Sequence, residues 1–236
     1  DIGVTGVQTC ALPISAMNID SLERARFNMV QQQIRPWEVF DRRVLALINE
    51  VPRDQFVERA YVGLAYADIE IPLGHGQRMM FPRVEARLLQ ALDVKPGDKI
   101  LEIGTGSGYL TACLAKLGGQ VISLDIHEDF TAQARTRLDA QDIGNVELIT
   151  ADALAAVIPG GPFDVIAVTG SLPELPDSLK QQLAIGGRLF AVIGEPPAME
   201  ACLITRVGED AWRSEGLFET ELRVLENALQ TEQFQF

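Results

Sequence analysis

Three glycines alternate with small residues in the stretch LEIGTGSGYLTA, residues 101–112. Glycine has no Cβ, so a backbone built on it can turn sharply and come close to a bound molecule. The stretch follows a strand-like apolar segment and opens a helix-like one, which is where open α/β sheets bind ligands. We therefore predict a ligand site around Gly104, Thr105, Gly106 and Gly108.

The acid that precedes these glycines, Glu102, indicates which ligand class to expect. The glycine spacing is G-x-G-x-G, whereas dinucleotide folds prefer G-x-G-x-x-G, in which a helix N-terminus receives a pyrophosphate. A carboxylate at this point would repel a pyrophosphate and attract a ligand that carries an ammonium and a sulfonium cation. The sequence thus predicts S-adenosylmethionine as the cofactor, and it disfavours a nicotinamide-dependent oxidoreductase.

Two further acids follow later strand-like segments. Asp125 ends QVISLD about twenty residues after the glycines, where an acid can accept hydrogen bonds from both ribose hydroxyls. Asp152, in the turn TADA, is expected to reach the adenine amino group. An alternative is that both acids are helix N-caps, which is common for Asp after a strand. The predicted cofactor site also includes three neighbours of these strand ends, namely Ile126, Ala153 and Thr169.

Short apolar segments alternate with helix-like segments around these residues. Five of them are apolar on both faces, as buried parallel strands are: KILEI, QVISLD, NVELIT, FDVIAVT and GRLFAVI. Helices are expected around residues 107–117, 128–141 and 174–183. This order predicts an α/β fold with a doubly wound, Rossmann-like sheet. ACLITRV and GLFETELRVL have no helix between them, so we expect an antiparallel edge at the C-terminal end.

Two helices are expected ahead of the sheet. The pattern SLERARFNMVQQQ predicts a helix from Asp20 to about Gln33, and the step from Arg35 to Pro36 ends it, because proline pushes the preceding residue out of the α region. DRRVLALINEV predicts a second, short helix that ends at Pro52. With the loop that follows, these helices form a predicted N-terminal helical cap.

A third helix is expected to begin at Pro82, since proline is favoured in the first turn of a helix. Its apolar stripe consists of Val84, Leu88, Leu89 and Leu92. The turn VKPGDK follows it. We therefore divide the chain into a cap with the acceptor-side loop over residues 17–95 and a cofactor-binding α/β domain over residues 96–236.

Composition narrows the class of protein. The chain has 236 residues, of which 47% are apolar and 22% charged, enough for one sizeable core. Its formal net charge of -13 argues against non-specific nucleic-acid binding, which needs a basic surface. No run of about 20 apolar residues suggests a membrane span. Three cysteines without motif spacing fit a reducing compartment, so a cytoplasmic location is expected.

The first residues are treated separately. VTGVQTCALPI resembles the translation of a sequencing adapter, so residues 1–16, with Cys10, are expected to be an assembly scar ahead of Met17. A natural disordered leader is the alternative. His75 is interpreted as a turn residue, and with His127 as the only other histidine, no metal site is expected.

Six segments together resemble one family, the protein-L-isoaspartate O-methyltransferases, from about Phe27 to Gly194. They fall in the family's order and spacing: MVQQQIR, VPRDQFV, AYADIEIPLGHGQ, LEIGTGSGYLTA, FDVIAVTGSLPELPDSL and GGRLFAVIG. The resemblance implies methyl transfer from S-adenosylmethionine to the carboxylate of an isoaspartyl residue, the first step of repairing damaged proteins. Because a carboxylate is ionised at pH 7, such an enzyme mainly positions its reactants.

The stretch GHGQRMMFPR departs from the family's usual loop, which is close to G-Q-T-I-S-x-P. Gly76, Gln77 and Pro82 match, but Met80 replaces the serine that is usually given a catalytic role, and a thioether cannot donate a hydrogen bond. The catalytic residue is therefore left unassigned. The predicted acceptor side, between this loop and the Thr169 turn, consists of His75, Gln77, Arg78, Met80, Gly170 and Ser171.

Two interpretations of this loop remain open. Its methionines and Phe81 could line a pocket for a different acceptor, with Arg78 or Arg83 holding an anionic group. Alternatively these apolar residues pack the cap onto the sheet and both arginines are solvated. The predicted function is an S-adenosylmethionine-dependent O-methyltransferase that acts on a protein or peptide carboxylate or on a small acceptor. A catalytically silent, cofactor-binding regulator is the alternative, and the oligomeric state is left open.

Overall fold

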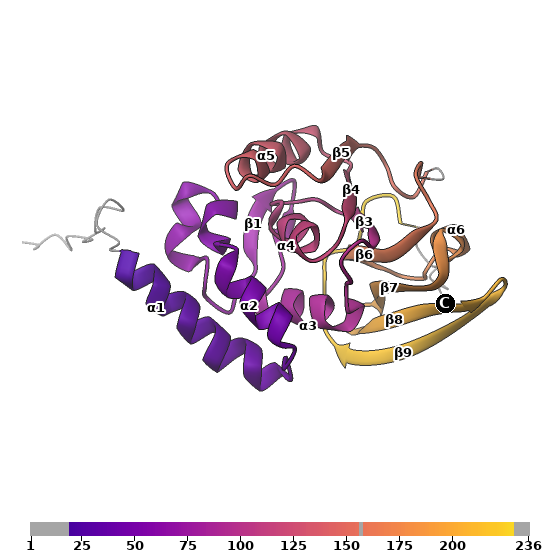
Figure 1. Cartoon of the computed structure of the whole chain (residues 1–236), viewed down its shortest axis with the longest axis horizontal. Helices are drawn as coiled ribbons and strands as arrows, with labels where there is room; N and C mark the ends of the chain where they lie inside the picture. The colour runs from indigo at the N-terminus through magenta and orange to yellow at the C-terminus, as the bar shows by residue number, and fades with distance from the viewer. Residues whose placement is uncertain (1–18, 156–157, 229–236) are drawn as a thin grey trace, which may run out of the picture.

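A central sheet organises the molecule. The computed structural model describes residues 19–155 and 158–228, so the predicted scar of residues 1–16 lies outside the described residues. Within the described residues, seven strands form the sheet in the order β5-β4-β3-β6-β7-β8-β9 (Figure 1). These strands are β3 (Lys99–Ile103), β4 (Gln120–Asp125), β5 (Val146–Thr150), β6 (Phe163–Leu172), β7 (Leu183–Glu195), β8 (Ala198–Gly208) and β9 (Ala211–Glu219).

Strands β3 to β7 run parallel, and β8 and β9 continue the sheet antiparallel. The predicted α/β class and antiparallel edge are confirmed. The last strand begins earlier than expected, because β8 turns back immediately after Gly208 and β9 already pairs from Ala211. Residues 220–225, which we expected to be part of this edge, lie beyond β9.

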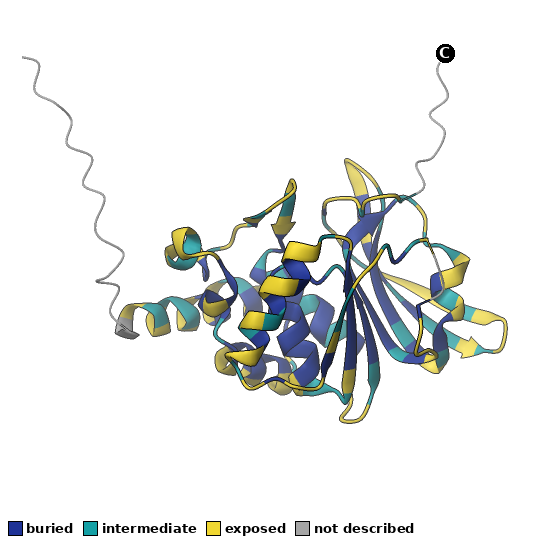
Figure 2. Cartoon of the chain, turned by 90° about the horizontal axis from the view of Figure 1, so that it is seen from above, coloured by how far each residue is buried: buried dark blue, intermediate teal, exposed yellow. Residues whose placement is uncertain are grey.

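Helices cover both faces of the sheet. Three follow the strands, namely α4 (Tyr109–Leu117), α5 (Glu128–Asp139) and α6 (Asp177–Gln181). Neighbouring strand residues point to opposite faces. Ile100 belongs to an apolar cluster with residues of α3 (Pro82–Leu92) and α4, and Leu101 to a second cluster with Leu179 of α6. Figure 2 shows the buried interior of the strands between exposed outer surfaces.

The N-terminal helix extends further than predicted. Helix α1 (Ile19–Met29) continues through a π-helical turn, η2 (Val30–Ile34), into a 3₁₀ turn, η3 (Arg35–Trp37). Arg35 keeps helical dihedrals, φ −60° and ψ −42°. The chain leaves the helix at Glu38, with a left-handed φ of 62°. Pro36 is tolerated because it lies in the first turn of the 3₁₀ helix, where its missing N–H has no intrahelical partner to lose.

The remaining elements of the N-terminal region lie between this helix and the sheet. They are α2 (Arg42–Glu50), the 3₁₀ turns η4 (Arg53–Phe56) and η5 (Arg59–Leu64), and α3 (Pro82–Leu92). The second helix and the helix at Pro82 are confirmed, and the apolar stripe of α3 is buried. Cap and sheet share one apolar cluster, in which Ile48 and Val165 both lie. The domain division at residue 95 stays a prediction.

One segment that we expected to be a loop forms a hairpin. Strands β1 (Ile71–Gly74) and β2 (Gln77–Met79) pair antiparallel, with Ile71 opposite Met79. His75, between them, adopts a left-handed φ of 49°. The tip of the hairpin is therefore held by two paired strands whose facing residues, Ile71 and Met79, are both less than 5% exposed.

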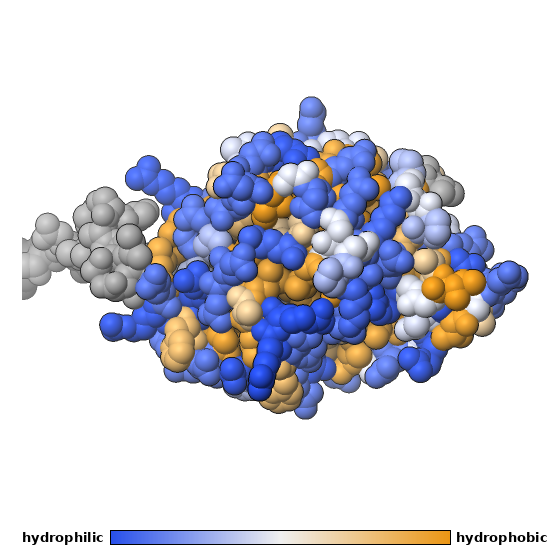
Figure 3. Space-filling model, viewed as in Figure 1, coloured by the Kyte–Doolittle hydropathy of each residue, from blue (hydrophilic) through white to orange (hydrophobic). Residues whose placement is uncertain are grey.

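On the face shown in Figure 3, hydrophilic residues predominate and apolar residues are visible between them. Among the helices of the described residues, none has the length and hydropathy that crossing a bilayer requires.

Candidate functional site

A cleft of about 770 Å³ opens at the carboxyl ends of β3, β4 and β6. Its walls come from the glycine turn, the residues after β4, the β1–β2 hairpin and a C-terminal segment. Among the described residues, the cleft is lined by Glu70, Leu73, Gln77, Arg78, Met80, Ile103, Gly104, Gly106, Leu124, Asp125, Ile126, His127, Phe130, Ala151, Asp152, Ala153, Leu154, Thr169, Gly170, Leu222, Arg223, Leu225 and Glu226.

The glycine turn is pressed against the strand end that carries Thr169. Gly104 has a φ of 95°, and a Cβ there would lie 2.1 Å from the Thr169 hydroxyl oxygen. That hydroxyl is hydrogen-bonded to the carbonyls of Ile103 and Gly104, at 3.0 and 2.7 Å. Gly108, with a φ of 83°, begins α4, and a Cβ there would lie 3.0 Å from that of Ala134. Both glycines are therefore required by space as well as by conformation.

Asp125 joins the glycine turn to the next loop. Its carboxylate accepts the Gly106 N–H at 2.9 Å and the His127 N–H at 3.0 Å. An ionised carboxylate has about four acceptor positions, so it can still accept hydrogen bonds from a ligand in the cleft. The N-cap residue of α5 is His127, so Asp125 is not a helix cap and instead closes a turn by bonding two residues ahead.

Asp152 makes the same kind of turn. Its carboxylate accepts the Leu154 N–H at 2.9 Å and the Asn227 side-chain amide at 2.8 Å. No helix follows Asp152 in the described residues before position 156. The N-cap alternative therefore does not describe either acid, and both lie at the cleft beside Ile126 and Ala153.

Glu102 does not lie where the sequence argument placed it. It is fully buried and is not among the described residues that line the cleft. Its Oε2 atom accepts hydrogen bonds from Thr111 and Ser123, and its Oε1 atom has no partner among the described residues. Burial raises the pKa of Glu102 from 4.5 to about 8, which favours its neutral form near pH 7. Glu102 is therefore not positioned to contact a ligand in the cleft directly.

Glu102 instead supports the glycine turn indirectly, through hydrogen-bonded side chains inside the sheet. Ser123, which donates to Glu102 at 2.6 Å, also shares a 2.7 Å hydrogen bond with the hydroxyl of Thr105. Thr105 is 4% exposed and lines a smaller hollow of about 310 Å³ next to the main cleft. Hydrogen bonds from Glu102 through Ser123 to Thr105 therefore connect the interior of the sheet to the glycine turn.

Met80 lies between the main cleft and the smaller hollow, and it lines both. It is 5% exposed. Its backbone carbonyl accepts a 2.6 Å hydrogen bond from Arg53, which is completely buried. The same guanidinium binds the carboxylate of Glu85 at 3.0 and 3.3 Å and the carbonyl of Ala65 at 2.9 Å. The position of Met80 is therefore fixed by its main chain.

The two arginines of this loop differ. The guanidinium of Arg83 stacks over the rings of Trp37 and Phe81, 4.6 and 4.1 Å from their centroids, so it is not simply solvated. Arg78 lines the cleft, and its Nη1 atom lies 3.9 Å from a carboxylate oxygen of Glu70. Of the two, Arg78 is the one placed to hold an anionic group in the cleft.

Two predicted acceptor-side residues lie away from the cleft surface. Ser171 is completely buried, and its hydroxyl donates to the Leu222 carbonyl at 3.0 Å. His75 is outside the lining residues and contacts Asp129 and His127 instead. Gln77 and Gly170 do line the cleft.

Sequence reasoning missed the C-terminal wall, residues 222–226. Backbone bonds of Ser171 to Arg223 and Leu225, at 2.8 and 3.0 Å, hold this segment beside β6. Glu226 then reaches His127 at 2.8 Å and Gln77 at 3.3 Å. No local pattern marks this segment as a ligand site, because its contacts are with residues far away in the sequence.

Comparison with known proteins identifies the family. The family model described as protein-L-isoaspartate(D-aspartate) O-methyltransferase matches residues 24–216. A protein-L-isoaspartate O-methyltransferase 1 of Rhodopseudomonas palustris is 40% identical over 198 residues, 84% of this chain and 81% of that protein. One of Koribacter versatilis is 38% identical over 186 residues, 79% of this chain and 82% of that protein.

A solved structure agrees. It is described as a beta-aspartate methyltransferase of Plasmodium falciparum in complex with S-adenosyl-L-homocysteine, and it shares 25% identity and a TM-score of 0.72 over 86% of this chain and 97% of that one. The shared sequence and the shared fold both extend over most of the chain. This chain therefore belongs to the protein-L-isoaspartate O-methyltransferase family.

Proposed function

We propose that this protein transfers the methyl group of S-adenosylmethionine to the carboxylate of isoaspartyl residues in damaged proteins, the first step of their repair. The chain is a methyltransferase by family. The observation that carries the proposal is the cleft itself, in which the glycine turn and Asp125 form one wall and Met80, directly after the hairpin, forms another.

The residues of the cleft fit the cofactor. Gly104 leaves no room for a side chain and brings main chain to the cleft surface. Asp125 offers carboxylate oxygens for ribose hydroxyls, and Ile126, 36% exposed, offers an apolar surface for an adenine ring. Asp152 and Ala153 complete this side. When bound, S-adenosylmethionine supplies an electrophilic methyl group on a sulfonium.

The acceptor side needs no strong base. A carboxylate is already ionised at pH 7, so the protein's contribution is to hold it in line with the methyl group. Arg78 is suited to bind an anionic group of the substrate by forked hydrogen bonds. The hydroxyl that the family usually presents is replaced by Met80, so the substrate must be oriented by other groups.

Met80 also affects how strongly the cleft stabilises the charged reactants. Methyl transfer converts a carboxylate and a sulfonium into two neutral groups. An apolar wall stabilises separated charges poorly, so it disfavours the charged ground state more than the partly neutralised transition state. Met80 therefore favours transfer without a hydrogen bond to the acceptor.

The proposal also concerns the partners and the location of the protein. A net charge of -13 argues against a nucleic-acid partner. Among the described residues, Cys113 and Cys202 are free thiols, which fits a reducing, cytoplasmic location.

The test is transfer of a radiolabelled methyl group to an isoaspartyl peptide, with the same peptide containing ordinary aspartate as the matched control. We expect labelling of the isoaspartyl peptide alone. Met80→Ser should retain turnover, whereas Asp125→Ala should lose it together with cofactor binding. Wild-type protein that binds S-adenosylhomocysteine but labels neither peptide would overturn the proposal.

Met80→Ser also separates the two alternatives. If the variant labels the isoaspartyl peptide and the wild type does not, the wild type has a different acceptor. If neither does, although both bind S-adenosylhomocysteine in calorimetry, the chain is a cofactor-binding regulator without turnover.

A further inference from the structure

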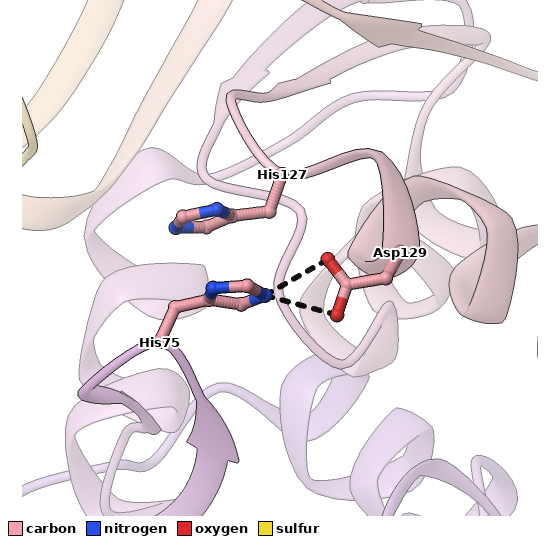
Figure 4. A group of neighbouring side chains, drawn as sticks. All are labelled: His75, His127 and Asp129. Atoms are coloured by element: carbon pink, nitrogen blue, oxygen red, sulfur yellow. Dashed lines mark hydrogen bonds and ion pairs between the residues drawn. The ribbon is translucent and has the colours of Figure 1, made fainter.

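The two histidines of the chain meet beside the cleft, which His127 lines and His75 does not. His75 lies at the tip of the β1–β2 hairpin, and His127 directly precedes α5. Their rings are stacked, with centroids 4.0 Å apart and planes 11° from parallel. Asp129, in the first turn of α5, lies at the edge of the His75 ring, with its carboxylate oxygens 3.0 and 3.1 Å from Nε2 (Figure 4).

These three side chains could serve as ligands to one metal ion. One ligand atom from each of His75, His127 and Asp129 lies within 4.8 Å of the others. Ligands of a tetrahedral Zn²⁺ at 2.0 to 2.2 Å are roughly 3.3 Å apart. The largest spacing must therefore shrink by up to about 1.5 Å, and the stacked rings must turn so that the ion lies in the plane of each. The side chains of His75 and Asp129 are 45% and 52% exposed, so they can rotate without disturbing the core.

A second contact prepares His127 for this role. Its Nε2 atom is 2.8 Å from Oε1 of Glu226, on the C-terminal wall. A neutral imidazole that directs its N–H at a carboxylate keeps the lone pair of the other ring nitrogen. Metal-binding histidines are commonly oriented in this way, by a carboxylate on the nitrogen that does not bind the metal. Glu226 would thus fix the tautomer in which Nδ1 of His127 is the ligand.

The donor set indicates the kind of ion. Imidazole nitrogens suit Zn²⁺, Ni²⁺ and Cu²⁺, whereas Mg²⁺ and Ca²⁺ prefer oxygen ligands alone. Two imidazoles and one carboxylate leave a coordination position for water. The chain's net charge of -13 also favours cations near its surface.

We propose that His75, His127 and Asp129 bind one divalent transition-metal ion of the Zn²⁺ type, which fastens the β1–β2 hairpin to the β4–α5 corner of the cleft. The ligands come from both sides of that junction, since His75 belongs to the hairpin and the other two residues to the β4–α5 segment. This role lies outside methyl transfer and needs no cofactor.

The direct test is titration with Co²⁺, a coloured substitute for Zn²⁺, followed by visible absorption, and with Zn²⁺ by calorimetry. We expect one equivalent to bind. His75→Ala and His127→Ala should each weaken the affinity at least about 100-fold, and Glu226→Gln about 10-fold or more, as loss of an orienting carboxylate does. Asp139→Asn is the matched control, because it removes an exposed acid of the same helix, and it should change nothing.

Two results would overturn the proposal. One is wild-type protein that binds no stoichiometric metal, and the other is equal affinity in the wild type, His75→Ala and His127→Ala. Unchanged circular dichroism and thermal midpoints without metal would establish that the variants fold.

Hydrogen exchange tests the fastening itself. Zn²⁺ should slow amide exchange in residues 71–79 of the wild type and not of His127→Ala, which keeps the hairpin sequence intact. Metal binding without this protection would overturn the structural role assigned to the ion.

Discussion

Arg53 donates a 2.6 Å hydrogen bond to the backbone carbonyl of Met80 from a position without solvent exposure. The residue that departs from the family's loop is therefore held by its main chain, which a side-chain substitution leaves in place. Glu85 pairs with the same guanidinium at 3.0 Å. Changes at residue 80 can thus alter the chemistry of the cleft without moving the hairpin.

Arg53→Met is expected to destabilise the fold by about 3–5 kcal/mol, because it leaves the buried Glu85 carboxylate and two carbonyls without their partner. The double variant Arg53→Met with Glu85→Leu should recover much of this loss. Urea denaturation measures both. Lys116→Met, which breaks the exposed pair with Glu50, is the control and should cost less than about 1 kcal/mol. A single Arg53 variant as stable as that control would contradict the assignment.

Gly104→Ala should abolish measurable binding of S-adenosylhomocysteine, because the new Cβ would lie 2.1 Å from the Thr169 hydroxyl oxygen and displace the turn. Gly97→Ala is a matched control, since Gly97 has a φ of 93° against 95° for Gly104 and a Cβ there would meet nothing within 4 Å. Both variants place alanine at nearly the same positive φ. Calorimetry should show near wild-type affinity for Gly97→Ala, and equal losses in the two would show that strain alone is responsible.

Asp125→Asn should weaken S-adenosylhomocysteine binding about 10- to 100-fold, the range expected for hydrogen bonds to a charged group worth about 1.5–3 kcal/mol. Asp164→Asn controls for the loss of a carboxylate that binds a backbone N–H, since Asp164 accepts that of Lys99 at 2.8 Å and does not line the cleft. Fluorescence or calorimetric titration compares them. The interpretation fails if the two variants bind equally well.

Glu102 gives the fold a specific pH dependence. Its pKa rises on folding from 4.5 to about 8 because of burial, so between these values the folded state holds a proton that the unfolded state has lost. Its contribution to stability is therefore greatest below pH 4.5 and declines as the pH rises towards 8. Urea midpoints of Glu102→Gln should decline less than those of the wild type from pH 5 to 8. Parallel profiles would refute this assignment.

The parallel strands could be predicted from the sequence because each is a short apolar segment that is recognisable on its own. The sequence predicted the glycine turn because positive φ and close approach select glycine locally. Glu102 was misplaced because strand alternation puts it on the face of Ile100, towards Thr111 of α4, and not at the edge of the sheet. This alternation of side chains along β3 could have been recognised from the sequence alone.

Other features depend on contacts that no local pattern encodes. The paired histidines are 52 residues apart in the sequence and meet only because the hairpin folds over the end of β4. The wall formed by residues 222–226 is held by Ser171, and its own composition is unremarkable. The π-helical turn that carries the first helix past Pro36 likewise reflects packing of Val30 and Ile34 in the core.

The same wall has a consequence for the order in which the protein matures. The sheet up to β9 is made before the ribosome reaches Leu222, yet the cleft is bounded by Leu222, Arg223, Leu225 and Glu226. A chain that ends before Leu222 would therefore lack one side of its ligand cleft and one member of its apolar core, Leu222. Cofactor affinity should be acquired only when this last stretch has been synthesised and has docked beside β6.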